Sequence, residues 1–291
     1  MSFIRKVKSK NDSTIKYIFK TKDNLIVEYS YIDKNDGKDI ICIPSQTMCL
    51  CSCKFCHSTE YIGKIPSRNL SSDEIIFPIK YIINDLNLVS NKKTLLISIM
   101  GIGEPIFNYK NIIQAMMLIK KLENSDSIPY IRFAIATSIP KNNIINFFKL
   151  TEAIKKHNLP VKLHFSLHYT NDEIRNKWMP ASLDIHSSLN AIDFYKNYTG
   201  NPVEIHYALI DGVNDTEIDA IILTDLLKGK YIDVKFLFYN KKEHDLYHTS
   251  KNIDRFKYRF KEWEIDNEYY VPPGLDVGAS CGAFMFDNYV G

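Results

Sequence analysis

Five of the six cysteines of this 291-residue chain lie in one stretch, Cys42-Ile43-Pro44-Ser45-Gln46-Thr47-Met48-Cys49-Leu50-Cys51-Ser52-Cys53-Lys54-Phe55-Cys56-His57. Three of them, Cys49, Cys53 and Cys56, have the spacing C-x3-C-x2-C. Thiolates prefer soft metals such as iron and zinc, so three thiolates in one loop can converge on one metal centre. Iron–sulfur clusters are usually held by four cysteines, so three would leave one iron open to a small molecule.

The same loop also fits a structural zinc site with His57 as the fourth ligand. Structural zinc is normally four-coordinate, and its ligands often lie two to four residues apart. The loop by itself does not decide between the two kinds of site, and more distant parts of the chain bear on the choice.

The composition, with 45% apolar residues, fits one large α/β domain or two small ones. No run of about 18 apolar residues occurs, and Met1 to Lys10 is basic and polar. We therefore expect a cytoplasmic monomer without a membrane partner, in which clustered cysteines indicate metal or redox chemistry rather than disulfides. The net charge of +3 is only weak evidence for a nucleic-acid partner.

Two alternating runs, Ile15 to Phe19 and Leu25 to Tyr29, flank a polar turn and predict a β-hairpin. A short strand from Asp39 to Ile43 then leads into the cysteine loop. We expect residues 1–36 to form an N-terminal β-hairpin extension and residues 37–291 to form the main domain.

Predicted strands and helices alternate after the cysteine loop, and a capping box at Ser71-Ser72-Asp73-Glu74 begins the first helix. The predicted strands span residues 39–43, 94–100, 131–136, 161–167, 203–210 and 234–238. The predicted helical segments span about 71–88, 109–122, 142–157, 191–198, 217–227 and 253–263. Six such units predict an α/β fold, a partial and open (β/α)6 barrel.

Polar residues follow several of these strands, at the end that carries the active site in (β/α) barrels. Gly101-Ile102-Gly103-Glu104-Pro105 could bring the backbone close to a ligand and let Glu104 bind an ammonium group, or could be a plain tight turn. Ser166-Leu167-His168 and Asn240 also follow strands, although each alone fits a polar rim or a turn.

Two features lie toward the C-terminus. Cys281 stands among small residues, which suits a loop that brings a thiol close to another group or a buried, inert cysteine. The helix from Ile253 to Trp263 has an apolar face and a basic face that runs from Arg255 to Lys261. Core packing with a solvated basic face is favoured over a face that contacts phosphates.

Together these residues resemble the radical S-adenosylmethionine (SAM) enzymes, and specifically the RlmN/Cfr family of RNA adenine methyltransferases, from about Ser13 to Gly282. The resemblance implies that a [4Fe-4S] cluster is held by Cys49, Cys53 and Cys56. It implies that Cys281 is the methylated cysteine, that Cys42 is the resolving cysteine and that Glu28 is the proton acceptor. It implies SAM contacts from Gly103, Glu104, Ser166, Leu167, His168 and Asn240.

The chain departs from the family pattern at several places. The family's N-terminal helical RNA-binding domain has no match, which leaves room for a separate RNA-binding partner. Ala136 stands where the family has a SAM-contacting serine, with Thr137 or Ser138 as the substitute. Pro273 replaces an arginine, and Cys51 is an extra thiol that we interpret as packing.

The resemblance implies methylation of an adenine carbon of ribosomal or transfer RNA, with carbon-2 favoured over carbon-8. These carbons are electron-poor, so the cofactors would carry out the difficult step of activating the methyl group. A flavodoxin- or ferredoxin-like protein would donate the electrons. Methyl-Cys281 would be linked to adenine, Glu28 or Cys42 would remove the ring proton, and Cys42 would release the product. The alternatives are a radical SAM enzyme of another reaction type and a non-catalytic, zinc-stabilised RNA-binding protein.

Overall fold

The computed structural model describes residues 1–34, 36–88, 94–124, 130–242, 245–279 and 284. Its strands form one ten-stranded sheet whose order follows the chain from β1 to β10. The strands are β1 (Ser2–Lys8), β2 (Ile15–Lys20), β3 (Ile26–Asp33), β4 (Lys38–Ile43), β5 (Thr94–Ile99), β6 (Tyr130–Thr137), β7 (Val161–Ser166), β8 (Val203–Ala208), β9 (Asp233–Leu237) and β10 (Asn267–Tyr270). The α-helices are α1 (Ser72–Asp85), α2 (Tyr109–Lys120), α3 (Ile144–Lys156), α4 (Asp172–Trp178), α5 (Ile185–Thr199), α6 (Glu217–Leu227) and α7 (Ile253–Glu262).

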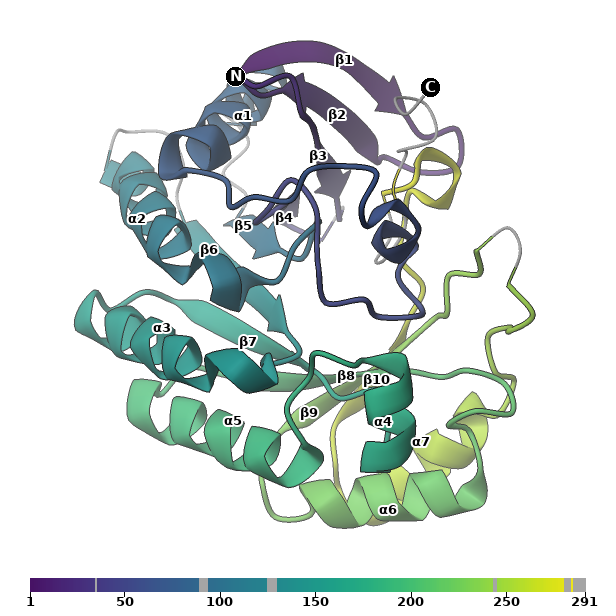
Figure 1. Ribbon diagram of the computed structural model, residues 1–291. Coiled ribbons are helices and arrows are strands. Elements are labelled where there is room, and N and C mark those ends of the chain that lie inside the picture. Colours follow the sequence, from purple (N-terminus) through teal and green to yellow (C-terminus); the bar gives the residue numbers. More distant parts are fainter. Residues whose placement is uncertain (35, 89–93, 125–129, 243–244, 280–283, 285–291) are drawn as a thin grey trace.

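The strands from β4 to β10 are parallel, and helices connect them as in a (β/α) barrel. The predicted six βα units are confirmed, but a seventh parallel strand, β10, follows them and was missed by the prediction. Figure 1 shows that the helices cover the outer side of a curved sheet. The end strands β1 and β10 are not paired with each other, so the barrel is open, as expected.

The N-terminal extension has three strands instead of the two that were predicted. β2 and β3 form the expected hairpin, and β1 pairs antiparallel with β2 along the edge of the sheet. β1 was missed because residues 1–10 are basic and polar, and most of its side chains are exposed. β3 pairs with β4, so the sheet continues across residues 36 and 37. The division into two domains at this point stays a prediction.

The hydrophobic core lies between the sheet and the helices. Apolar side chains of α1, such as Ile79 and Ile82, and of β5, such as Ile97, are fully buried there. The predicted capping box is present, because the Ser71 hydroxyl accepts from Glu74 N at 3.2 Å and Glu74 accepts from Ser71 N at 3.0 Å. Within the described residues, no helix combines the length and the apolar character needed to cross a membrane.

The segment from Pro272 to Ala279 folds back onto the turn between β1 and β2. The Gly274 amide donates to Asp12 Oδ2 at 2.7 Å, and the Ser9 hydroxyl donates to Asp276 Oδ1 at 2.7 Å. Gly274 has a φ of 71°, and a Cβ at this position would lie 2.7 Å from carbon atoms of two neighbouring side chains. Only glycine fits this contact. Figure 1 shows this yellow segment beside the purple N-terminal strands.

Candidate active site

The cysteine loop follows β4 and folds as a series of tight turns. The Cys56 amide donates to the Cys53 carbonyl at 3.0 Å, and the Thr59 hydroxyl donates to the same carbonyl at 2.7 Å. The ring of Phe55 lies edge-on to His168, with 5.0 Å between the ring centroids. These contacts hold the loop against the carboxyl end of β7, where a barrel places its active site.

The spacing of the thiols distinguishes the two kinds of metal site. Zinc binds sulfur at about 2.3 Å, so three ligands of one zinc ion lie within about 4 Å of one another. The structure describes Cys49, Cys53, Cys56 and His57. Among the described residues, only one group of three has metal-ligating atoms that all lie within 4.8 Å of one another, and that group lies elsewhere in the fold. Cys49, Cys53, Cys56 and His57 are therefore not arranged as a closed zinc site. A cluster that contains several irons does not require its thiolate ligands to lie so close together.

Burial shapes the acidity of these thiols. Burial raises the pKa of Cys56 to about 11 and raises the pKa of Cys53 well above its usual value. A hydrogen bond from Cys51 lowers the pKa of Cys49. A bound cationic centre would reverse the effect of burial and favour the thiolates.

A cavity of about 170 Å³ adjoins the cysteine loop. Cys56 lines it, together with residues at the carboxyl ends of three strands. These are Ala136 near the end of β6, Ser166 at the end of β7 and His168 just after it, and Asn240 after β9. The structure thus brings three of the predicted SAM contacts together beside a predicted cluster ligand. Their contact with SAM stays a prediction.

The backbone around His168 is held in a fixed, left-handed conformation with a φ of 54°. His168 Nδ1 accepts a hydrogen bond from the Ala208 amide at 3.0 Å, and its carbonyl accepts one from Asn214 Nδ2 at 2.6 Å. Burial lowers the pKa of His168 well below its usual value. The cavity therefore has a neutral imidazole in its wall.

The three other predicted SAM contacts are not among the residues that line this cavity. Glu104 is buried and accepts hydrogen bonds from the Thr137 hydroxyl at 2.6 Å and the Ser138 amide at 3.1 Å. Burial raises the pKa of Glu104, although these hydrogen bonds oppose the shift. Leu167 is fully buried in the core. Thr137 and Ser138 thus hold Glu104 in place.

Gly103 lies against the chain segment that leads into the cysteine loop. It has a φ of 108°, and a Cβ at this position would lie 2.3 Å from Ser45 Oγ and 2.8 Å from Gln46 N. Gln46 in turn accepts a hydrogen bond from the Glu104 amide at 3.0 Å. The Gly-Glu-Pro turn therefore positions the cysteine loop by direct backbone contact.

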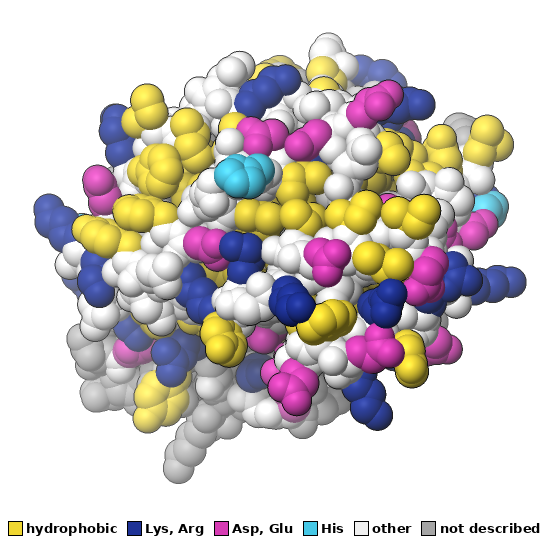
Figure 2. Space-filling view, turned by 90° about the horizontal axis from the view of Figure 1, so that it is seen from below, with side chains coloured by type: hydrophobic (Ala, Val, Ile, Leu, Met, Phe, Trp, Pro, Cys, Tyr) yellow, Lys and Arg dark blue, Asp and Glu magenta, His cyan; other side chains and the backbone are white. Residues whose placement is uncertain are grey.

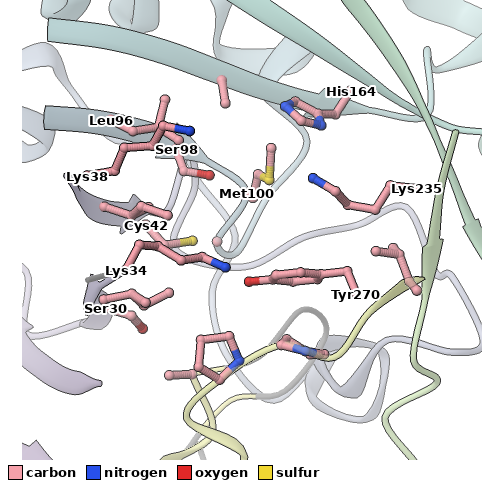
Figure 3. Close-up of a pocket in the computed structure, with 18 of the residues that line it drawn as sticks. Ser30, Lys34, Lys38, Cys42, Leu96, Ser98, Met100, His164, Lys235 and Tyr270 are labelled. Carbon is pink, nitrogen blue, oxygen red and sulfur yellow. The ribbon is translucent and has the colours of Figure 1, made fainter. Parts of the chain in front are cut away.

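A second cavity, of about 370 Å³, occupies the interior of the barrel. It shares five lining residues with the smaller cavity, namely Met100, Gly101, His206, Leu237 and Phe284. In Figure 3, Cys42 and Lys34 lie on one side of this cavity, His164 and Lys235 lie on the opposite side, and Met100 lies between them. The predicted resolving cysteine thus faces a space that adjoins the cysteine-loop cavity.

The predicted proton acceptor Glu28 also lines the larger cavity and forms a buried ion pair. Lys16 Nζ lies 2.7 Å from Glu28 Oε2, and the two side chains are 3% and 1% exposed. Lys16 also donates to the carbonyl of Gly278 at 2.6 Å. Sequence reasoning missed Lys16, although a lysine and a glutamate within the otherwise apolar strands of one hairpin could have indicated the pair. Cys281 lies outside the described residues.

A second buried polar cluster lies on the opposite side of the larger cavity. Glu204 Oε1 is 2.9 Å from His164 Nδ1, 2.9 Å from Lys235 Nζ and 3.3 Å from His206 Nε2. Its other oxygen, Oε2, pairs with Lys162. Of these residues, sequence reasoning noted only His164. The alternation of Glu204 and His206 within a buried strand was the signal for the rest.

His164, Glu204 and His206 have ligand atoms close enough together to hold a metal ion. The two lysines that pair with Glu204 argue against a cation there. At an effective dielectric constant of about 20, a divalent ion about 4 Å from an ammonium group is repelled by about 8 kcal/mol. This cluster is therefore a hydrogen-bonded ion network and not a metal site.

The sequence pattern of the radical SAM superfamily matches residues 43–224, more than half of the chain. Enzymes of this superfamily use a [4Fe-4S] cluster together with SAM. The C-x3-C-x2-C cysteines are compatible with the cluster, and a cavity adjoins them. The fold agrees, because the structure of SuiB from Streptococcus suis bound to SAM matches 84% of this chain and 52% of that one with a TM-score of 0.55, at 14% identity.

Similar proteins cover nearly the whole chain. The probable dual-specificity RNA methyltransferase RlmN of Lachnoclostridium phytofermentans is 34% identical over 96% of this chain and 75% of that protein. The protein of the same name from Clostridium tetani is 32% identical over 97% and 77%. A radical SAM methyltransferase from Sphaerobacter thermophilus has a similar structure, with a TM-score of 0.83 and 26% identity over 97% of this chain and 80% of that one. The chain therefore belongs to the radical SAM superfamily and, within it, to the RlmN family.

Proposed function

We propose that this protein is a radical SAM methyltransferase that adds a methyl group to an adenine carbon of RNA, with carbon-2 favoured, by way of methyl-Cys281. The observation that carries the proposal is the pair of adjoining cavities. One lies beside the cysteine loop, and the other contains Cys42 and Glu28. The names of the RlmN relatives support RNA as the substrate.

The residues that line the two cavities have different roles in this proposal. When bound, the cluster and SAM supply a carbon radical that can remove a hydrogen atom from a methyl group. Ser166, His168 and Asn240 line the cavity in which SAM would be held. Glu28 and Cys42 line the cavity in which the target base would lie, where one of them takes the ring proton. The Cys42 thiolate then attacks the Cys281 sulfur, which breaks the bond from that sulfur to the methylene carbon, frees the methylated base and leaves a Cys42–Cys281 disulfide that an external thiol reductant must reopen.

The target adenine must leave its stack to enter a cavity inside a barrel. Ribosomal or transfer RNA in the cytoplasm would provide such bases, and a flavodoxin- or ferredoxin-like protein would donate the electrons. A separate protein would assist RNA binding, and the enzyme would act as a monomer.

The basic helix α7 contributes little to such binding. Phe256 and Phe260 are fully buried, which confirms the expected core packing. Arg255 and Arg259 lie 3.4 and 3.9 Å from Glu217, so acidic groups accompany its basic face. Figure 2 shows acidic and basic side chains interspersed over the face seen from below. The described residues of this face therefore form no extended basic patch of the kind that binds phosphates.

Protein purified without oxygen should be brown and contain about four irons and about four sulfides per chain. The reason is the C-x3-C-x2-C motif of Cys49, Cys53 and Cys56 in a chain of the radical SAM superfamily. Metal analysis and visible absorption would measure this. Substitution of any one of the three by alanine should remove the colour, whereas Cys51→Ala should retain it. Colourless protein with about one zinc would instead support the zinc-stabilised alternative.

RNA from cells that contain the gene should carry a methylated adenine that is absent when the gene is deleted. Nucleoside mass spectrometry would detect it, and synthetic standards would separate carbon-2 from carbon-8. The intact mass of the purified protein should show one methyl group on Cys281. SAM cleavage without methylated Cys281 and without methylated adenine would favour a radical SAM enzyme of another reaction type.

A further inference from the structure

Arg175, on α4, is a buried cation that has no part in the reaction as proposed above. The residue is only 1% exposed. Of the residues that the structure describes, none places a carboxylate in an ion pair with its guanidinium group, whose hydrogen bonds go to backbone carbonyls and one thioether. An arginine keeps its charge in a protein, and a buried charge is costly unless another group compensates it.

The hydrogen bonds of Arg175 join the ends of two neighbouring strands. Nη1 donates to the Ser166 carbonyl at 2.9 Å and to the Leu167 carbonyl, at the end of β7. Nη2 donates to the Ser138 carbonyl at 3.3 Å, just after β6, and Nε donates to the Leu183 carbonyl at 3.3 Å. Carbonyl dipoles stabilise a cation, but they bring no net negative charge. The positive charge of the guanidinium group is therefore not neutralised by these partners.

Further contacts connect Arg175 with the cysteine loop. Its Nη1 lies 3.4 Å from Met179 Sδ. Met179 and Trp178 belong to a small apolar cluster against which Cys53 packs. The Lys54 amide donates to the Trp178 carbonyl at 2.8 Å, which fixes the loop to the end of α4. The guanidinium group thus lies behind the part of the loop that contains Cys53.

Among the charges near Arg175, that of Cys53 matters most. Burial lowers the pKa of Arg175 to about 10, and a negative charge on Cys53 opposes this shift more than Asp172 or Asp184 does. Arg175 therefore stays protonated at neutral pH. The anionic group with which it interacts most strongly is a predicted ligand of the cluster.

We propose that Arg175 is a positioning residue that acts on the iron–sulfur cluster through Cys53, with its fixed positive charge favouring the reduced state. The proposal rests on the proposed assignment of Cys53 as a ligand. Three thiolates around a doubly positive core leave one net negative charge, and one electron from the donor protein adds a second. Net charge and solvent exposure set the reduction potential of such clusters. A buried cation behind the loop lowers the cost of the added negative charge.

Redox titration of the cluster-loaded protein without SAM tests this proposal, because no turnover takes place. The electron paramagnetic resonance signal of the reduced cluster gives the midpoint, and iron and sulfide analysis confirms loading. Arg175→Gln removes the charge, whereas Arg175→Lys retains it, and both lose the planar fork that bonds the carbonyls. At an effective dielectric constant of about 20, charges on the order of 10 Å apart change an equilibrium constant on the order of tenfold. Arg175→Gln should therefore make reduction about tenfold less favourable, which lowers the midpoint by about 59 mV. Arg175→Lys should keep the midpoint of the unmodified protein.

Lys177→Gln is the matched control, because Lys177 is an exposed cation of the same helix and solvent screens its charge. It should leave the midpoint unchanged. The effect of Arg175→Gln should persist at high salt, since a buried charge is screened much less. Equal midpoints for Arg175→Gln and the unmodified protein would overturn the proposal.

Equally lowered midpoints for Arg175→Gln and Arg175→Lys would also overturn it, since Arg175 would then act only by holding the carbonyls. If Arg175→Gln fails to fold, Arg175→Lys decides. An unchanged midpoint supports the proposal, and a lowered midpoint or a failure to fold overturns it. A brown protein without the expected shift would leave the cluster assignment intact. An unmodified protein that holds no cluster would overturn that assignment and this inference together.

Discussion

Cys42→Ala protein is expected to accumulate a covalent complex with RNA that survives denaturant and thiols. In the proposed cycle Cys42 acts only after a methylene bridge has joined Cys281 to adenine. Removal of its thiol should leave SAM cleavage and the methylation of Cys281 intact and should block the last step. The bridge is a thioether, so reductants should not release it. Denaturing gels of nuclease-treated protein, with mass spectrometry of the Cys281 peptide, would measure the complex.

Cys51→Ala is the matched control, because Cys51 is a second non-ligand thiol of the same loop and is buried. It should form no complex and should retain turnover. Cys281→Ala should form no complex either, and the double variant with Cys42→Ala should behave in the same way. If Cys42→Ala protein stays free while it cleaves SAM and carries methylated Cys281, the resolving role assigned to Cys42 is wrong.

Lys16→Met is expected to destabilise the protein by about 3–5 kcal/mol, because it leaves the carboxylate of Glu28 buried without the Lys16 ammonium group. For a chain of this size the loss corresponds to a fall in the unfolding midpoint on the order of 10 °C. The variant also loses the contact with the Gly278 carbonyl, which lies three residues before Cys281. We therefore also expect a lower fraction of methylated Cys281. Thermal unfolding and intact-protein mass would measure the two effects.

Lys230→Met is the control for this experiment. Its ion pair with Asp193 is 27% and 30% exposed, so its loss should cost less than about 1 kcal/mol. The double variant Lys16→Met with Glu28→Gln should recover part of the stability, because it no longer buries an uncompensated charge. It should not recover methylation of Cys281. Equal unfolding midpoints for Lys16→Met and Lys230→Met would show that the buried pair contributes nothing measurable.

The sequence was sufficient to predict the six βα units and the convergence of Ser166, His168 and Asn240 on one cavity. Alternation and helical spacing mark elements that bury one face, and the carboxyl ends of parallel strands meet at one edge of the sheet. β10 escaped prediction because it has only four residues. α4 escaped because it has only seven. Such short segments contain too few residues for a period to be recognised.

The hydrogen-bond and ion-pair partners of the site residues were harder to predict than the places of these residues in the fold. Glu104 accepts hydrogen bonds from hydroxyl and amide donors of Thr137 and Ser138, which the sequence did not indicate, and its contact with SAM stays a prediction. Lys16 and Glu204 were overlooked because a charged residue in a strand is usually placed on the solvent side. Here the interior of the barrel is itself polar. The alternation of polar and apolar residues along a strand therefore does not show whether a polar side chain faces the solvent or the cavity.

The contacts between the β1–β2 turn and the segment from Pro272 to Ala279 bear on how the protein folds during synthesis. Asp12 and its partner Gly274 are 262 residues apart in the chain. At about 5–20 residues per second, the ribosome makes this stretch in about 13 to 50 seconds. The N-terminal strands and the cysteine loop are therefore synthesised long before the segment that borders the larger cavity. This segment can complete the border of the larger cavity only after nearly the whole chain has been synthesised.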